Sequence, residues 1–263
     1  MSDPRVQLGE SFDRVATQYD RVRPGYPEVV FDRIAAYAHL DTASHLLELG
    51  TGTGKATLPF AQRGFSVVGL EPGEDLVRVA RTVLAGFPGV QLHCTTFESW
   101  SSPEAAFDLV FAAQSFHWLD PEERLARIAF ALRRPGAVAI FGNSATTAGD
   151  PLHERLQAVY AERAPSLLGR AEVHAWYGSA DSPVVDELSR NTLFRDVRSE
   201  VFPWRQSLSS TEYCELLSTY SDHSTLPASE LASLLGAIAD VVLAAGDVIT
   251  LDYRTALFQA RAI

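Results

Sequence analysis

The residues best suited to chemistry form a glycine-rich segment, 48–55, which reads Glu-Leu-Gly-Thr-Gly-Thr-Gly-Lys. Glycine adopts backbone conformations that other residues avoid, and it lets a ligand lie against the chain because no Cβ stands in the way. Glu48 opens the segment, and a second carboxylate, Glu71, ends the next apolar run. The segment therefore predicts a ligand-binding turn, with a carboxylate nearby that is placed to accept the hydroxyl groups of a ribose.

Spacing separates the cofactor classes that use such a turn. The dinucleotide fingerprint G-x-G-x-x-G needs a third glycine where this chain has Lys55 in one register and Thr57 in the other. The phosphate-binding loop G-x-x-x-x-G-K-[ST] needs a glycine in place of Leu49 and a hydroxyl in place of Ala56. What remains is acidic-x-G-x-G-x-G, which suits a ligand that has a ribose but no diphosphate.

Short apolar runs alternate with amphipathic segments from residue 45 onward, and they predict an α/β fold. Near-continuous apolar runs are typical of parallel strands that helices cover on both faces. The pattern predicts a doubly wound, mostly parallel sheet of seven strands. Pro203 follows the sixth strand and favours a place at the sheet edge, because proline has no N–H to donate. The expected strands are 45–49, 66–70, 90–94, 108–112, 137–141, 196–202 and 253–260.

The best-marked helix is expected after the fourth strand. Asp120 would cap it, Pro121 would be its first residue, and Arg133 and Arg134 would favour its C-terminal end. We predict one domain, 1–263, with a helical lid over the ligand crevice. Further helices are expected near 75–85, 151–163, 211–219 and 228–245; the core spans about 40–145, 196–203 and 250–263, and the lid about 1–30, 146–195 and 207–247.

Composition excludes several classes of function. The chain of 263 residues has 22 Lys+Arg and 33 Asp+Glu, a formal net charge of −11, which argues against a nucleic-acid partner. Residues 1–5 lack the apolar stretch of a signal peptide, and the apolar stretch 231–246 is too short to cross a hydrocarbon layer of roughly 30 Å. The two cysteines lie far apart and the seven histidines are scattered, so neither a disulfide nor a metal site is expected. We expect a cytoplasmic monomer or homodimer with no membrane partner.

Taken together, these motifs resemble those of the class I S-adenosylmethionine-dependent methyltransferases, within the methyltransferase type 11 group. The resemblance covers most of the chain and is strongest to the branch that includes trans-aconitate methyltransferases. It includes a leader, 12–27, the glycine turn, Glu71-Pro72 and the segment 114–120. It implies S-adenosylmethionine as the cofactor and a small organic molecule as the methyl acceptor.

The resemblance also implies roles for single residues. Glu48 and the turn residues Gly50, Thr51 and Gly52 would lie along the methionine part of the cofactor. The remaining cofactor contacts would be Glu71 on the ribose, Pro72 beside the adenine, Tyr19 and Arg23 over the carboxylate, and Gln114 after the fourth strand. The family often has an Asp after the third strand; this chain has Thr96-Phe97-Glu98, so the adenine would rely on the Phe97 backbone and the Glu98 carboxylate. For Tyr19, the apolar face of an amphipathic helix is an equal alternative.

Methyl transfer from a sulfonium is an in-line displacement, so a protein must mainly hold the nucleophile about 3 Å from the methyl carbon and exclude water. The segment 114–118 is expected to face the methyl group. His117 suits the removal of a proton from a hydroxyl or amine acceptor, while a packing or capping role is equally open. The expected substrate contacts are Trp118, Trp176, Arg205, Tyr220 and His223, where Arg205 would pair with a carboxylate as the resemblance suggests.

For any single aromatic residue of the lid, a place in the core is the stronger interpretation. Two other functions stay open. One is a cofactor-binding protein of the same fold that transfers nothing, since fold does not fix function. The other is a methyltransferase that acts on proteins. A nicotinamide dehydrogenase is disfavoured by the missing third glycine.

Overall fold

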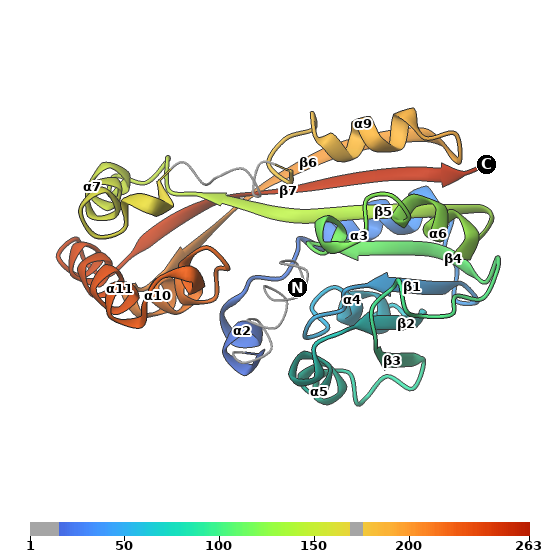
Figure 1. Ribbon diagram of the computed structural model, residues 1–263, viewed down its shortest axis with the longest axis horizontal. Helices are drawn as coiled ribbons and strands as arrows, with labels where there is room; N and C mark the ends of the chain where they lie inside the picture. Colours follow the sequence, from blue (N-terminus) through green and yellow to red (C-terminus); the bar gives the residue numbers. More distant parts are fainter. Residues whose placement is uncertain (1–15, 169–175) are drawn as a thin grey trace.

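A seven-stranded sheet in the order β3-β2-β1-β4-β5-β7-β6 organises the protein (Figure 1). The computed structural model describes residues 16–168 and 176–263. Strands β1 to β5 pair in parallel, and β7 runs antiparallel to both β5 and β6. The α/β class and the mostly parallel sheet are therefore confirmed. The strands are β1 (His45–Leu49), β2 (Ser66–Glu71), β3 (Val90–Cys94), β4 (Phe107–Ala113), β5 (Leu132–Thr146), β6 (Phe194–Leu208) and β7 (Ile249–Ala262).

The strand order creates a crevice. The chain proceeds from β1 outward to β3 and then returns to place β4 on the other side of β1. In open α/β sheets, ligands bind beyond the carboxyl ends of the strands at such a switch point. The residues that follow β1 and β4 are thereby placed at the edge where a ligand site is expected.

Alternate residues of the central strands pack on opposite faces of the sheet. Leu47 and Val110 belong to one buried cluster, together with residues of α6 (Arg124–Ala131) and α9 (Pro183–Arg190). Leu46 and Leu109 belong to a second cluster, together with residues of α3 (Glu28–Ala38) and α4 (Thr57–Gln62). Because both faces are covered, the central strands are almost wholly apolar, as the sequence pattern requires.

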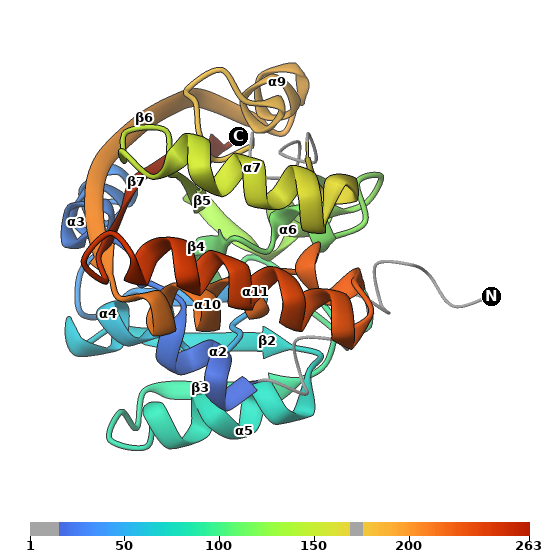
Figure 2. The ribbon, with the colours of Figure 1, turned by 90° about the vertical axis from the view of Figure 1, so that its left-hand side faces the viewer.

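A third buried cluster lies at one end of the long strands β5, β6 and β7, on the left in Figure 1. It joins these strand ends to α7 (His153–Arg163), α10 (Ser210–Ser218) and α11 (Ala228–Leu243), which we call the end group. The described part of the leader, 16–27, contains α2 (Ala16–Val22), and α2 lies beside α10 (Figure 2). The end group occupies much of the expected lid region, and a lid function stays a prediction; α9, from the same region, packs on the main sheet.

The helix after β4 differs from its prediction at both ends. Asp120 Oδ1 accepts from the backbone N–H of Glu122 at 2.9 Å, which stabilises a turn, and α6 begins only at Arg124. Arg133 and Arg134 lie in β5, because the chain pairs with β4 from Leu132 onward. The predicted helix from Pro121 to Arg134 is therefore too long. The remaining predicted helices are present, with 75–85 found as α5 (Glu74–Val83).

Strand β6 forms one edge of the sheet, as expected for a strand near Pro203. It is longer than predicted and contains Pro203, which lies opposite Arg254 of β7. Leader residues 12–15 lie outside the described residues. Among the helices of the described residues, none is long and apolar enough to cross a membrane.

Candidate functional site

The glycine turn lies between β1 and α4 and has the unusual backbone that its sequence predicts. Gly50, Gly52 and Gly54 have φ angles of +76°, +57° and +91°. A Cβ on Gly50 would lie 2.5 Å from the Ser115 Cβ, so this glycine permits the close approach of the chain that follows β4. A Cβ on Gly52 would meet no protein atom within 4 Å. Gly52 thus leaves open space beside the turn, where a ligand can approach the backbone.

Glu71 joins the end of β2 to this turn. Its Oε2 accepts from the backbone N–H of Gly52 at 2.8 Å, and its Oε1 accepts from the N–H of Gly73 at 2.9 Å. The turn also rests on β2 through its main chain, because the N–H groups of Gly50 and Thr51 both donate to the Leu70 carbonyl. The carboxylate predicted to bind ribose therefore also holds the turn in place.

Glu48 is wholly buried at the end of β1 and lines a pocket. Its Oε2 accepts from Thr57 Oγ1, whereas its Oε1 has no hydrogen-bond partner among the described residues. Burial raises the pKa of the Glu48 carboxyl group to about 8; the Thr57 hydrogen bond lowers it, and the nearby charge of Glu71 raises it further. A buried acidic oxygen without a partner is costly, and a donor on a ligand would satisfy it.

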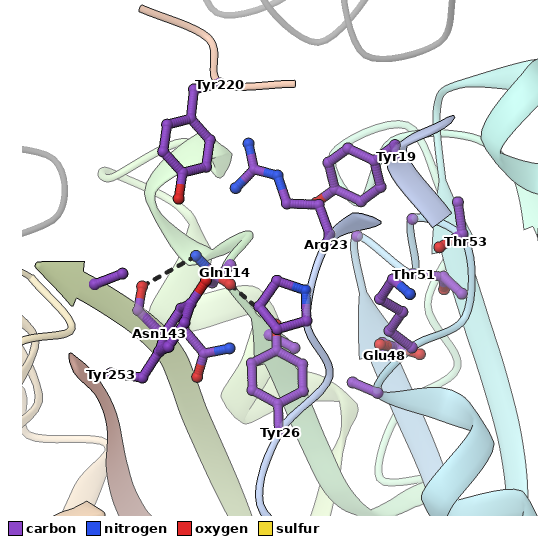
Figure 3. A pocket seen from close by; sticks show the side chains of 17 residues that line it. Tyr19, Arg23, Tyr26, Glu48, Thr51, Thr53, Gln114, Asn143, Tyr220 and Tyr253 are labelled. Atoms are coloured by element: carbon purple, nitrogen blue, oxygen red, sulfur yellow. Dashed lines mark hydrogen bonds between the residues drawn. The ribbon is translucent and has the colours of Figure 1, made fainter. Parts of the chain in front are cut away.

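The pocket lies at the carboxyl ends of β1, β4 and β5 and is covered by the leader (Figure 3). Several of the residues that sequence predicts for cofactor and substrate contacts line it. These are Tyr19, Arg23, Glu48, Gly50, Thr51, Gly52, Gln114 and Tyr220. The structure thereby brings together residues as distant in the chain as Tyr19 and Tyr220, which are 201 positions apart.

Arg23 connects the leader to the end group above the pocket. Its Nε donates to Thr219 Oγ1 at 2.9 Å, and its Nη2 donates to the Thr219 carbonyl at 2.7 Å. The guanidinium lies 4.4 Å from the ring centroid of Tyr220 and 5.2 Å from that of Tyr19. Lys55 of the glycine turn also holds the leader, through the Asp20 carbonyl. The pocket therefore has a roof made of two segments that are distant in sequence.

Several residues of the lining were not predicted from the sequence, among them the polar residues Tyr26, Lys55, Asn143 and Tyr253. Tyr26 belongs to the leader, and Lys55 belongs to the glycine turn, so their motifs had already placed them nearby. Asn143 stands near the carboxyl end of β5, at the same sheet edge as the turn, and this position was the available signal. Tyr253 carries no comparable signal, because β7 runs antiparallel to its neighbour.

The predicted adenine contacts lie outside the pocket lining. Pro72 is exposed, and the Phe97 side chain is buried in the cluster that includes Leu47. Glu98 Oε1 accepts from the backbone N–H of Asp120 at 3.1 Å. The lining thus covers the methionine end expected for the cofactor, and the adenine assignments stay predictions.

His117 belongs to an aromatic group next to the pocket. Its Nδ1 lies 3.3 Å from the Tyr177 hydroxyl, and its ring centroid lies 4.8 Å from that of Trp118 and 6.4 Å from that of Trp176. Tyr177 packs over Gly142, on which a Cβ would lie 2.6 Å from the Tyr177 ring and 2.7 Å from Gln114 Cγ. The predicted base and the two predicted wall residues therefore lie together, near Gln114 but outside the lining.

Two of the predicted substrate contacts lie elsewhere. Arg205 is largely exposed on β6, and its Nε donates to Asp252 Oδ1 at 2.6 Å. His223 is buried in the end group, where Nδ1 contacts Asp222 Oδ1 at 2.7 Å and Nε2 contacts the Tyr160 hydroxyl at 2.8 Å. Both ring nitrogens of His223 are engaged, Arg205 pairs with Asp252, and neither residue lines the pocket; their assignment as substrate contacts stays a prediction.

Over residues 16–168 and 176–263, no group of three or more His, Cys, Asp or Glu side chains is arranged to hold a metal ion.

Known proteins similar to this chain include methyltransferases. Residues 46–136 match the family model described as a methyltransferase domain. An uncharacterized methyltransferase of Mycobacterium tuberculosis is 26% identical over 265 residues, which cover 99% of each chain.

Solved structures share the fold. A putative type II methyltransferase from Anaeromyxobacter dehalogenans has a TM-score of 0.62 at 21% identity, over 91% of this chain and 97% of that one. Phosphoethanolamine N-methyltransferase 2 of Haemonchus contortus, solved with S-adenosylhomocysteine, has a TM-score of 0.59 at 16% identity, over 100% of this chain and 60% of that one. The trans-aconitate branch stays a prediction. The matched methyltransferase domain and the full-length relative support a class I S-adenosylmethionine-dependent methyltransferase, and the solved structures share its fold.

Proposed function

We propose that this protein transfers a methyl group from S-adenosylmethionine to a small organic molecule by in-line displacement. The observation that carries the proposal is the pocket in which the partnerless Glu48 Oε1 and the open side of Gly52 meet under the roof formed by Arg23. These groups fit the methionine end of the cofactor, which has an ammonium group, a carboxylate and a sulfonium. The pocket also lies at the carboxyl ends of the strands, which is where open α/β sheets bind their ligands.

The charged groups of the methionine part have matching partners. Glu48 Oε1 is the acceptor for the ammonium group, which would pair the buried carboxylate with a positive charge. Arg23 and Tyr19 are the partners for the carboxylate, as the family resemblance implies. Gly50, Thr51 and Gly52 would pass close to the sulfonium, because the turn has no side chain at two of these positions.

The ribose and the adenine would extend toward β2 and β3. Glu71 accepts from the backbone N–H groups of Gly52 and Gly73 at the end of β2, and the family resemblance makes its carboxylate the proposed acceptor for the ribose hydroxyls. Pro72, the Phe97 backbone and Glu98 are the proposed adenine contacts. Their support is the resemblance and their position in the segments that directly follow β2 and β3.

The acceptor would lie near Gln114, Tyr220 and Tyr253, on the side of the pocket away from Glu48 (Figure 3). The cofactor supplies a methyl group on a sulfonium that is already a good leaving group. The protein then needs to orient the acceptor and exclude water, which the roof of Arg23, Thr219 and Tyr220 supports. His117 remains the proposed base for a hydroxyl or amine acceptor, whereas a carboxylate or thiolate needs none.

We also propose that the protein is cytoplasmic and acts as a monomer or homodimer. The net charge of −11 supports the absence of a nucleic-acid partner. Trp118 and Trp176 are proposed as wall residues near the acceptor, next to His117.

Two experiments test the central proposal in sequence. Titration calorimetry with S-adenosylmethionine, S-adenosylhomocysteine and NAD is expected to show binding of the first two only. Methyl transfer from labelled S-adenosylmethionine is then measured over a panel of carboxylic acids, phenols and amines, with a protein extract as a separate arm. Absence of S-adenosylmethionine binding contradicts the proposal; binding without transfer favours a non-catalytic cofactor protein, and transfer to the extract alone favours a protein-directed enzyme.

A further inference from the structure

Asn143 stands at the pocket end of β5, and both ends of its buried amide are bonded. Its Nδ2 donates to the Gly25 carbonyl oxygen at 2.9 Å, and its Oδ1 accepts from Thr255 Oγ1 at 2.6 Å. Gly25 belongs to the leader between α2 and α3, whereas Thr255 lies on β7. One amide therefore joins the leader to the sheet beside the cofactor pocket.

The direction of these bonds is fixed by groups that can play only one role. The Trp204 indole N–H, which can only donate, gives its hydrogen to Thr255 Oγ1 at 2.9 Å. The Gly25 carbonyl can only accept, so the Asn143 nitrogen must face Gly25 and Asn143 Oδ1 must face Thr255. The Thr255 hydroxyl hydrogen is therefore directed to Asn143 Oδ1. Tyr253 stacks on Trp204 with ring centroids 4.2 Å apart, which holds the indole in place.

The main chain of Asn143 orients a second amide, that of Gln114. The Asn143 carbonyl oxygen accepts from Gln114 Nε2 at 3.2 Å. Gln114 Oε1 must therefore face the opposite way, where the Tyr26 hydroxyl donates to it over 3.4 Å (Figure 3). Gln114 also has a φ of +54°, a conformation that non-glycine residues seldom adopt.

We propose that Asn143 is a positioning residue for methyl transfer, which sets the leader at Gly25 against Gln114 and so aligns the two walls of the pocket. The inference rests on the proposed function. Arg23 and Tyr26 lie within two residues of Gly25 and both line the pocket, so a displacement at Gly25 moves both side chains. Asn143 acts through these residues and needs no contact with the reacting atoms.

Asn143→Asp tests the proposal with almost no change of shape. The new carboxylate still accepts from Thr255, but its second oxygen opposes the Gly25 carbonyl with no proton between them. Affinity for S-adenosylhomocysteine, measured by titration calorimetry at pH 7.5, is expected to fall about tenfold, as for the loss of a buried hydrogen bond. At pH 5.5 the protonated carboxyl group can donate to the Gly25 carbonyl. The loss of affinity in the variant relative to the wild type is therefore expected to be smaller at pH 5.5 than at pH 7.5.

Matched variants separate this effect from a general change of charge. Asn191→Asp makes the same substitution outside the pocket lining, where Asn191 Oδ1 accepts from Leu193 N at 2.9 Å, a bond that a carboxylate keeps. It is expected to bind S-adenosylhomocysteine as the wild type does. Thr255→Val removes the hydroxyl that directs the amide and is expected to weaken binding, whereas Thr255→Ser should restore most of the lost affinity.

A double-mutant cycle distinguishes positioning from a loss of stability. Tyr26→Phe breaks the bond to Gln114, so its combination with Asn143→Asp should cost less binding energy than the sum of the single changes. Additive effects would overturn the positioning role, as would wild-type affinity in Asn143→Asp and Thr255→Val with only a lowered melting temperature. Failure of the wild type to bind S-adenosylmethionine would instead contradict the proposed function, and the inference with it.

Discussion

The Glu71 carboxylate accepts a hydrogen bond from the backbone N–H of Gly52 at 2.8 Å, and this contact couples the end of β2 to the glycine turn after β1. The same carboxylate is the proposed ribose acceptor. A ligand that binds Glu71 therefore meets a group that is already held by Gly52 and Gly73, with little conformational freedom left to lose.

Glu71→Ala is expected to weaken S-adenosylmethionine binding by tenfold or more. The substitution removes the ribose acceptor and also leaves the N–H of Gly52 without its partner, so the turn loses its register against β2. Calorimetry measures the affinity, and thermal unfolding measures the stability of the free protein. Glu104→Ala, on an exposed loop, removes the same charge and serves as control; equal affinity in both variants would contradict the ribose assignment.

Cofactor binding is expected to release a proton from Glu48. Burial raises the pKa of this carboxyl group to about 8, so at pH 7 it is mostly protonated, and pairing with an ammonium group favours the ionised form. Affinity for S-adenosylhomocysteine should therefore rise from pH 6 to about pH 8 and then level off. Calorimetry in two buffers of different ionisation enthalpy counts the protons released. Glu48→Gln is expected to abolish the proton release. If this variant releases as many protons as the wild type, the released proton comes from another group.

The stability of the free protein should show the opposite pH dependence. Because the pKa of Glu48 is higher in the folded chain than in the unfolded one, the folded state binds more protons between about pH 4.5 and pH 8. Glu48 therefore makes the free energy of unfolding fall as pH rises through this range, by as much as a few kcal/mol. Urea unfolding from pH 5 to pH 8.5 measures the slope. The curve for Glu48→Gln should be flatter than that of the wild type, and parallel curves would contradict the prediction.

Local patterns in the sequence were sufficient to predict the sheet and the turn. The apolar runs of β1 and β4 are typical of strands covered on both faces, and the spacing of Gly50, Gly52 and Gly54 predicted a turn with positive φ angles. The boundary at Leu132 was not predictable, because a sequence that suits a helix end is overridden there by pairing with β4. Such boundaries depend on pairing between strands that are distant in the sequence, and a local sequence pattern does not predict that pairing.

Contacts between distant segments explain why Arg205 and His223 lie outside the pocket lining. His223 and Arg205 have the residue types of a substrate site, but their partners, Tyr160 and Asp252, lie far away in the sequence. Asn143 was missed for the same reason, since its importance lies in bonds to the leader and to β7. Residue type and spacing identified the glycine turn. The opposite wall of the pocket includes Asn143 and Tyr253, and their positions depend on the pairing of the long strands β5 and β7.

Arg23→Lys is expected to weaken binding of S-adenosylhomocysteine about tenfold. Arginine bonds both polar groups of Thr219 with two different nitrogens and lies over the Tyr220 ring, a geometry that an ammonium group cannot reproduce. Arg21→Lys is the matched control, because Arg21 forms an exposed ion pair with Glu215, which contributes little. Equal affinities in the two variants, measured by calorimetry, would show that the roof does not depend on the guanidinium.

His117→Asn separates catalysis from binding. If His117 accepts the proton of a hydroxyl or amine acceptor, the variant should lose a factor of about 10² to 10⁴ in kcat and retain its affinity for S-adenosylhomocysteine. The contact between His117 and the Tyr177 hydroxyl would orient the ring for this role. His93→Asn changes an exposed histidine on β3 in the same way and should keep wild-type kcat. A kcat that survives in His117→Asn with a phenol or amine acceptor would leave His117 as a packing residue beside Trp118.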